Sequence, residues 1–148
     1  MAQTSSGPGR VLGLDLGDAR IGVAVSDDRR KLAVPLGTVH TGAPSDLKAI
    51  AALVRDNDVT LVVIGDPVLL SGEMGERSAK AREFARALRS FVGVPVVLHD
   101  ERLSSVEAER ELRAAGASGR DVRAASDRSA ATVILQSYLD SRDARAGS

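Results

Sequence analysis

The sequence contains no cysteine and only 2% aromatic residues, and both absences restrict its function. Without cysteine, a disulfide scaffold, a cysteine-ligated zinc site, an iron–sulfur cluster and a cysteine nucleophile are excluded, and a cytoplasmic location is expected. The shortage of aromatic rings argues against an aromatic platform on which bases stack. Two histidines, His40 and His99, offer little material for a metal site or a catalytic triad. Any chemistry must therefore use carboxylates, arginines, hydroxyls or a hard metal ion.

The chain also lacks a net charge, since its 20 basic residues balance its 20 acidic residues. A nucleic-acid-binding protein usually has a basic balance, so this composition argues mildly against one. The basic residues are nearly all arginines, whose planar fork suits phosphate groups, although a GC-rich genome explains the same bias. No apolar run approaches the ~18–20 residues of a membrane span, and no secretory signal is recognisable, so no membrane partner is expected.

The length of 148 residues predicts a single domain over residues 10–140, with unstructured ends at 1–9 and 141–148. Three β-rich runs are followed by a helix, two βα units and a final helix. This order predicts an α/β fold with a five-stranded mixed sheet, in which strands 1–3 form an antiparallel meander and helices cover both faces. The predicted strands are 10–16, 20–26, 32–40, 59–64 and 94–98, and the predicted helices are 45–57, 77–91, 104–116 and 127–140.

Asp15 is unusual because it lies within the first predicted strand. Alternation along this strand places Leu12 and Leu14 on one face and Asp15 on the other. Aspartate is rare in strands, and burial of an isolated carboxylate is costly unless a cation pairs with it. A metal ion or an arginine would relieve that cost, whereas a turn near Gly17 is the structural alternative.

Other acidic residues follow buried strands or begin the last helix. Glu101, next to Asp100, comes directly after a predicted strand, where α/β proteins gather their sites, although a surface charge cluster is the alternative. Asp127 lies on the same face as the apolar stripe of the last helix, so it is either an N-cap or a ligand. Asp66 precedes Pro67, and a turn role is its default interpretation.

Asp15, Glu101 and Asp127 come from separate elements of a chain that has no cysteine. Such a set of carboxylates suits hard divalent cations, Mg²⁺ or Mn²⁺, which take oxygen ligands. Two of these ions a few Å apart can activate a water and stabilise the leaving oxygen in phosphodiester hydrolysis. The residues alone therefore favour a metal-dependent phosphoryl-transfer site.

Four blocks of the sequence resemble, in the same order, those of the YqgF family, whose RuvX-type members are described as Holliday-junction resolvases and as pre-16S ribosomal RNA nucleases. The blocks contain Asp15 with Gly17, Asp66 with Pro67, Asp100 to Arg102, and Asp127 with the helix that follows. The resemblance covers nearly all of residues 10–140. It implies an RNase H-like fold and a two-metal-ion endonuclease acting on branched DNA or precursor ribosomal RNA.

The family's acidic ligands fall on Asp15, Glu101 and Asp127, which the resemblance implies hold one or two Mg²⁺ or Mn²⁺ ions. Asp66 departs from the family pattern, in which an apolar residue is usual, and either adds a fourth acid near the metals or caps a turn. A homodimer would suit paired cuts in a junction, whereas trimming of RNA needs one site. The arginines expected to contact substrate phosphates are Arg20, Arg77, Arg102, Arg120 and Arg123.

Two other functions stay open at this point. The segment from Gly13 to Gly17 also resembles the first phosphate motif of the actin/Hsp70/sugar-kinase group, which would make the chain an ATP-binding module. Those proteins clamp the nucleotide between two lobes, and this chain has room for one. A non-catalytic nucleic-acid or ribosome-assembly factor with the same fold is the other alternative, against which the three carboxylates argue.

Overall fold

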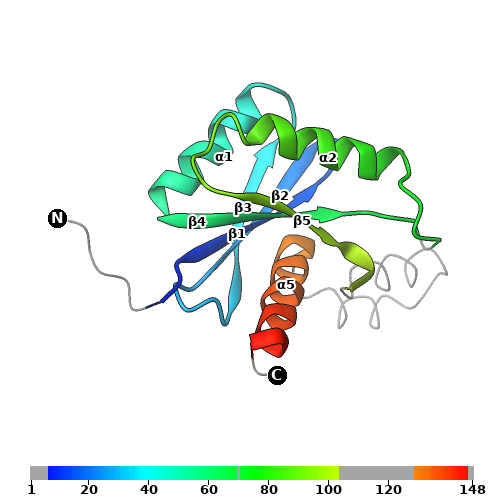
Figure 1. Ribbon diagram of the computed structural model, residues 1–148. Coiled ribbons are helices and arrows are strands. Elements are labelled where there is room, and N and C mark those ends of the chain that lie inside the picture. The colour runs from blue at the N-terminus through cyan, green and yellow to red at the C-terminus, as the bar shows by residue number, and fades with distance from the viewer. Residues whose placement is uncertain (1–6, 70, 104–128, 147–148) are drawn as a thin grey trace, which may run out of the picture.

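The computed structural model describes residues 7–69, 71–103 and 129–146. Its centre is a five-stranded sheet in the order β3-β2-β1-β4-β5 (Figure 1). The first three strands pair antiparallel, and β4 runs parallel to both β1 and β5, so the predicted mixed sheet is confirmed. The strands are β1 (Arg10–Leu16), β2 (Arg20–Ser26), β3 (Ala33–His40), β4 (Val59–Asp66) and β5 (Val96–Asp100).

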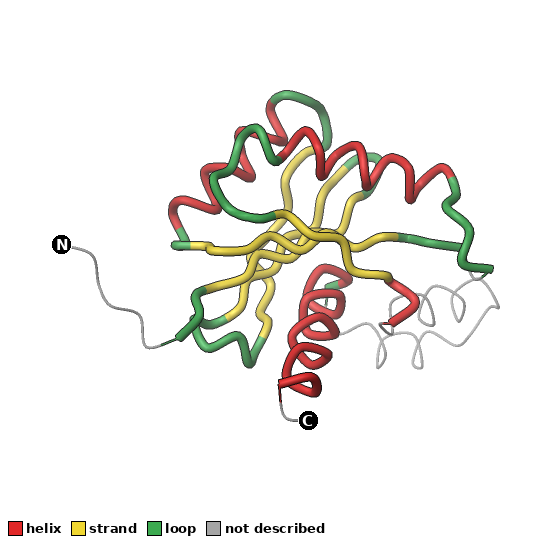
Figure 2. Tube along the Cα trace, viewed as in Figure 1, coloured by secondary structure: helices red, strands yellow, loops and turns green. Residues whose placement is uncertain are grey.

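Helices cover both faces of this sheet, as the element order predicts. α1 (Ser45–Asp56) and α2 (Glu76–Leu88) lie on one face, and α5 (Ala130–Ala146) lies on the other (Figure 2). A short 3₁₀ turn, η1 (Glu101–Leu103), follows β5 directly. The predicted helix over 104–116 lies outside the described residues. Within the described ranges, no helix is long and apolar enough to cross a membrane.

The strands supply a separate hydrophobic core to each helical layer, because successive side chains point to opposite faces. Leu12 and Leu14 pack into the core beneath α1 and α2, whereas Val11 packs into the core beneath α5. Gly13 also faces α5, since a Cβ added there would lie 2.7 Å from the Cβ of Leu135. The missing side chain therefore lets α5 approach β1 closely.

Several element boundaries differ from the predicted ones. β4 and β5 continue to Asp66 and Asp100, because pairing of these two residues extends the parallel ladder beyond the predicted ends. α5 continues to Ala146, so residues 141–146 are helical and not part of an unstructured tail. Lys31 Nζ lies 3.0 Å from Asp143 Oδ1, and this ion pair ties the end of α5 to the β2–β3 turn.

Candidate active site at the carboxyl edge of the sheet

Asp15 lies near the carboxyl end of β1, on the face that α5 covers. It pairs with Gly22 of β2, whose lack of a side chain keeps this position open. A Cβ added to Gly22 would lie 3.7 Å from the Asp15 Cβ and 3.5 Å from the Ala131 Cβ. Asp15 is therefore close to the first turn of α5, on the face that the strand alternation predicts.

Glu101 begins η1, immediately after β5, and only 2% of its surface is exposed. A Cβ added to Gly65 of β4 would lie 2.9 Å from Glu101 Oε1 and 2.7 Å from Ile134 Cδ1. The Glu101 carboxylate therefore occupies the space over Gly65, next to α5, that a side chain at position 65 would fill. Burial in this narrow space limits the positions that the carboxylate can take.

The pairing of β1 with β4 brings Asp15 and Glu101 to the same place. Leu14 pairs with Ile64, so Asp15 and Gly65 come next on the two neighbouring strands. Neighbouring strands lie about 4.7–4.9 Å apart. Since Glu101 lies over Gly65, two of the three predicted acids meet at the carboxyl edge of the sheet, on its α5 face.

The third predicted ligand, Asp127, lies outside the described residues, as do Arg120 and Arg123. Among the residues that are described, no group of three histidine, cysteine, aspartate or glutamate side chains could hold a metal ion. Asp127 comes four positions before Ala131 in the sequence, and Ala131, like Asp15, lies within 4 Å of the position of a Cβ at Gly22.

A pocket of about 280 Å³ opens beside Glu101, between the β1–β2 turn and α2. Arg77, one of the predicted phosphate contacts, lies on its wall together with Lys80. Arg20 is exposed at the start of β2, outside this lining. The pocket therefore combines a buried carboxylate with two cationic side chains of α2.

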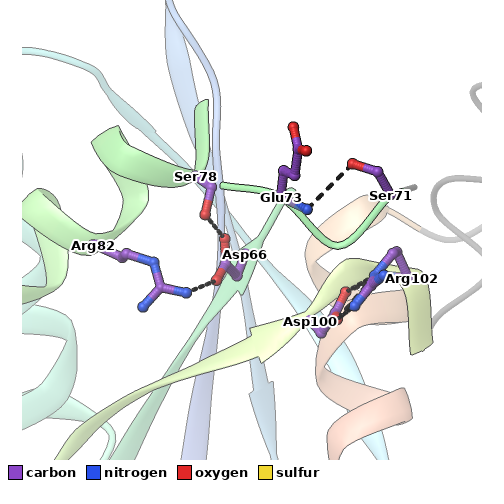
Figure 3. A network of polar contacts seen from close by, with 7 residues as sticks. All are labelled: Asp66, Ser71, Glu73, Ser78, Arg82, Asp100 and Arg102. Atoms are coloured by element: carbon purple, nitrogen blue, oxygen red, sulfur yellow. Dashed lines mark hydrogen bonds and ion pairs between the residues drawn. The ribbon is translucent and has the colours of Figure 1, made fainter. Parts of the chain in front are cut away.

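Asp100, the last residue of β5, forms an ion pair with Arg102 of η1. The Arg102 guanidinium donates from Nη2 to Asp100 Oδ2 at 2.6 Å and from Nε to the same oxygen at 3.0 Å (Figure 3). This hydrogen bonding lowers the pKa of Asp100, against an opposing effect of burial, and raises the pKa of Arg102. A Cβ on Gly72 would lie 3.5 Å from Arg102 Nη1, so the loop after β4 reaches this pair. Arg102, predicted to contact phosphate, is thus bound to a neighbouring carboxylate.

The sequence of this chain matches the model of the RuvX family, described as Holliday junction resolvase, over residues 9–141. The chain belongs to the RuvX family. Relatives named "Putative pre-16S rRNA nuclease" include one from Anaeromyxobacter dehalogenans (strain 2CP-C), 50% identical over 90% of this chain and 98% of the relative. Another, from Roseiflexus sp. (strain RS-1), is 42% identical over 93% of this chain and 99% of the relative. The predicted family, and with it the nuclease class of enzyme, is confirmed.

Solved structures of RuvC from Thermus thermophilus share the fold of this RuvX-family chain. The structure of RuvC in complex with a Holliday junction substrate has a TM-score of 0.50 at 16% identity, over 90% of this chain and 95% of that chain. A second RuvC structure has a TM-score of 0.50 at 15% identity, over 93% and 96% of the two chains. The RNase H-like fold that the sequence predicts is confirmed.

Asp66 has a role in this RuvX-family chain that the sequence interpretation missed. It lies on β4 with its side chain toward α2, on the face opposite Asp15, and is only 4% exposed. Its Oδ1 accepts a hydrogen bond from Ser78 Oγ at 2.5 Å, and its Oδ2 accepts one from Arg82 Nη2 at 3.2 Å (Figure 3). Ser78 and Arg82 are one helical turn apart, a spacing that could have indicated a shared partner. Asp66 therefore anchors α2 to the sheet.

Proposed function

We propose that this chain is a divalent-metal-dependent endonuclease that hydrolyses phosphodiester bonds in structured nucleic acid. The proposed metal ligands are Asp15, Glu101 and Asp127. The first two lie among the residues that the structure describes. The observation that carries it is that the buried Glu101 lies over Gly65 of β4, and that Asp15 follows Leu14 on the neighbouring strand β1, at the carboxyl edge of a sheet with the RuvC fold. Ligands of α/β proteins commonly bind at this edge.

The donor set at this edge fits Mg²⁺ or Mn²⁺, which prefer carboxylate oxygens and keep several waters. Gly65 lacks the side chain that would crowd the Glu101 carboxylate, since a Cβ there would lie 2.9 Å from Glu101 Oε1. When bound, such a cation supplies charge stabilisation for the hydrolysis of a phosphodiester. The fit rests on these two acids and on the pocket that Glu101 lines.

The protein's own contribution is to hold these groups in place before the substrate arrives. Asp15 is fixed by β1, which pairs on both sides, and Glu101 is fixed by burial between β4 and α5. Pre-positioned groups of this kind avoid reorganisation during the reaction. Arg77 and Lys80 on the adjacent pocket wall add positive charge where a phosphate backbone would approach Glu101.

Asp127 enters the proposal through the family resemblance and through its distance along the chain. It precedes Ala131 by four positions, so the two Cα atoms lie within about 14 Å of each other even when the chain is extended. A Cβ at Gly22 would lie within 4 Å of both the Ala131 Cβ and the Asp15 Cβ. This tether is short enough for the Asp127 carboxylate to join the other two acids.

The test is cleavage of a four-way DNA junction and of a precursor 16S rRNA end in parallel, with Mg²⁺ and Mn²⁺ supplied separately. We expect cleavage of at least one substrate, loss of cleavage in EDTA, and recovery when excess metal is added. Cleavage that continues unchanged in EDTA would contradict the metal mechanism. Binding without any cleavage would favour the non-catalytic factor instead.

The choice between the two substrates also bears on assembly and location. The relatives carry the name of an rRNA nuclease, whereas the family is described as junction resolvase. Paired cuts across a junction require two active sites, so a homodimer belongs to the junction proposal, and analytical ultracentrifugation with the junction tests it. Both substrates occur in the bacterial cytoplasm, which is the location we propose.

A further inference from the structure

The lining of the pocket beside Glu101 combines apolar and polar side chains. Leu16 and Ile21 contribute apolar surface from the β1–β2 region, and Phe84 contributes an aromatic ring from α2. Arg77 and Lys80 line it from the same helix. Asp18, Thr41 and Glu101 supply the other polar groups.

The size of the pocket restricts what can enter it. Its volume of about 280 Å³ is near the lower end of the ~300–1,000 Å³ typical of small-molecule sites. A cavity of this size accommodates one flat ring system with its sugar, but not a base pair or a duplex. A concave apolar site with a few convergent polar groups is also the usual form of a small-ligand site.

The chemistry of the lining matches a nucleotide. An aromatic side chain offers a face on which any base can stack, and one ring is enough for one base. Arg77 and Lys80 are three positions apart on α2, so they project from neighbouring turns of the same face. Their charges suit the phosphates that flank a base held against Phe84.

We infer that this pocket receives the base of one unpaired nucleotide next to the phosphate that is cut, with the base against Phe84 and its phosphates toward Arg77 and Lys80. The inference rests on the proposed function, because Glu101, which lies over Gly65 beside α5, also lines this pocket at the carboxyl edge on the α2 side of the sheet. The pocket implies that the substrate strand is single-stranded or splayed at the position of the cut. A continuous duplex is a poor substrate, because a paired base must first leave its stack.

The first experiment measures binding of nucleotides without metal and without cleavage. Wild-type protein is titrated with cytidine 5′-monophosphate and, separately, with ribose 5-phosphate, while the NMR signals of Ile21, Phe84 and Phe91 are followed. We expect the nucleotide to shift the Ile21 and Phe84 signals and to bind about tenfold more tightly than ribose 5-phosphate, because only the nucleotide can stack. Equal affinity of the two ligands would overturn the inference.

A matched pair of variants locates the base. Phe84→Leu keeps an apolar side chain against the core but removes the ring, whereas Phe91→Leu changes the chain's other phenylalanine, which is outside the pocket lining. We expect Phe84→Leu to weaken nucleotide binding about tenfold and to leave ribose 5-phosphate binding unchanged. Phe91→Leu should alter neither. Circular dichroism checks that both variants fold. If one does not, the relative affinity of the wild type for cytidine 5′-monophosphate and ribose 5-phosphate still tests the inference.

The second experiment uses two cleavage substrates that differ only in whether the nucleotide beside the cut is paired. Wild type should prefer the unpaired substrate, and Phe84→Leu should reduce that preference. Cleavage without preference, together with equal binding of the two small ligands, would reject the pocket and leave the nuclease proposal standing. Nucleotide binding at Phe84 without any cleavage would reject the nuclease proposal and leave the binding pocket.

Discussion

The two faces of the sheet carry acidic residues at the same edge but use them differently. On the α2 face, both carboxylate oxygens of Asp66 accept hydrogen bonds from side chains of the helix above. On the α5 face, Glu101 lies over Gly65 of β4, and Asp15 comes from the neighbouring strand β1. One face therefore uses a carboxylate to fasten a helix, and the other gathers carboxylates around a shared space.

The difference follows from strand alternation. Gly65 and Asp66 are adjacent on β4, so one faces α5 and the other faces α2. An acid at position 66 is therefore separated from Asp15 by the sheet, although the two lie at the same edge. Closeness along the edge therefore does not place Asp66 with the proposed metal ligands, and mutations on the two faces test this separation.

The largest effect is expected from the acids on the α5 face. Asp15→Asn and Glu101→Gln keep the shape of each side chain but remove its charge, so we expect both to abolish cleavage. Single-turnover assays with the junction and the precursor rRNA measure this, with circular dichroism as the check on folding. If Asp15→Asn cut both substrates at the wild-type rate, the assignment of this face would be wrong.

A set of three glycine variants sharpens the comparison within the α5 face. Gly65→Ala places a Cβ against both Ile134 and Glu101, so we expect a lower melting temperature and about 10–100-fold lower activity. Gly13→Ala presses on Leu135 without touching Glu101, and it should lower the melting temperature but preserve the activity of folded protein. Gly22→Ala meets only ordinary contacts and should be mild in both respects.

Thermal unfolding and cleavage rates measured on the same preparations separate these outcomes. Equal activity losses in Gly65→Ala and Gly13→Ala would show that packing beneath α5, and not the position of Glu101, limits the rate.

On the α2 face we expect an effect on stability. Asp66→Leu removes the partner of the buried Ser78 hydroxyl, which costs about 1–3 kcal/mol of unfolding free energy. Asp66→Asn keeps an acceptor for the Ser78 hydroxyl, so its free energy of unfolding should fall by less. Chemical denaturation measures both changes, and the Mg²⁺ concentration for half-maximal cleavage should stay at the wild-type value. A large rise in that concentration would place Asp66 in the metal site.

The smallest effect concerns the exposed pair of Asp100 and Arg102. Arg102 lowers the pKa of Asp100 below the value of the unfolded chain, so the pair stabilises the fold at neutral pH. This contribution is lost as the pH falls through the lowered pKa. Asp100→Asn should therefore have a slightly lower melting temperature than wild type at pH 7, and the difference should shrink as the pH falls through the lowered pKa of Asp100. A difference that persists at low pH would contradict the ion-pair explanation.

Much of this arrangement could be predicted from the sequence because it depends on local periodicity. Alternation in β1 correctly places Asp15 opposite Leu12 and Leu14. The position of Glu101 directly after β5 correctly predicts that it lies at the carboxyl edge.

The role of Asp66 could not be predicted in the same way. The neighbouring Gly65 and Pro67 are typical turn residues, and they suggest that the strand ends at Ile64. Pairing with β5 overrides that local preference and extends β4 to Asp66, which turns the carboxylate toward α2. Pairing with a strand far along the chain decides where β4 ends, and the local sequence pattern does not reveal that pairing. The place of Asp127 stays a prediction.

Binding of Mn²⁺ in the absence of nucleic acid, followed by electron paramagnetic resonance, tests the central claim most directly. The comparison needs wild type, Asp15→Asn, Glu101→Gln and Asp66→Asn, all checked for folding. We predict that the two variants on the α5 face bind Mn²⁺ at least about tenfold more weakly than wild type, while Asp66→Asn binds it equally well. Wild-type affinity in Asp15→Asn and Glu101→Gln would contradict the account.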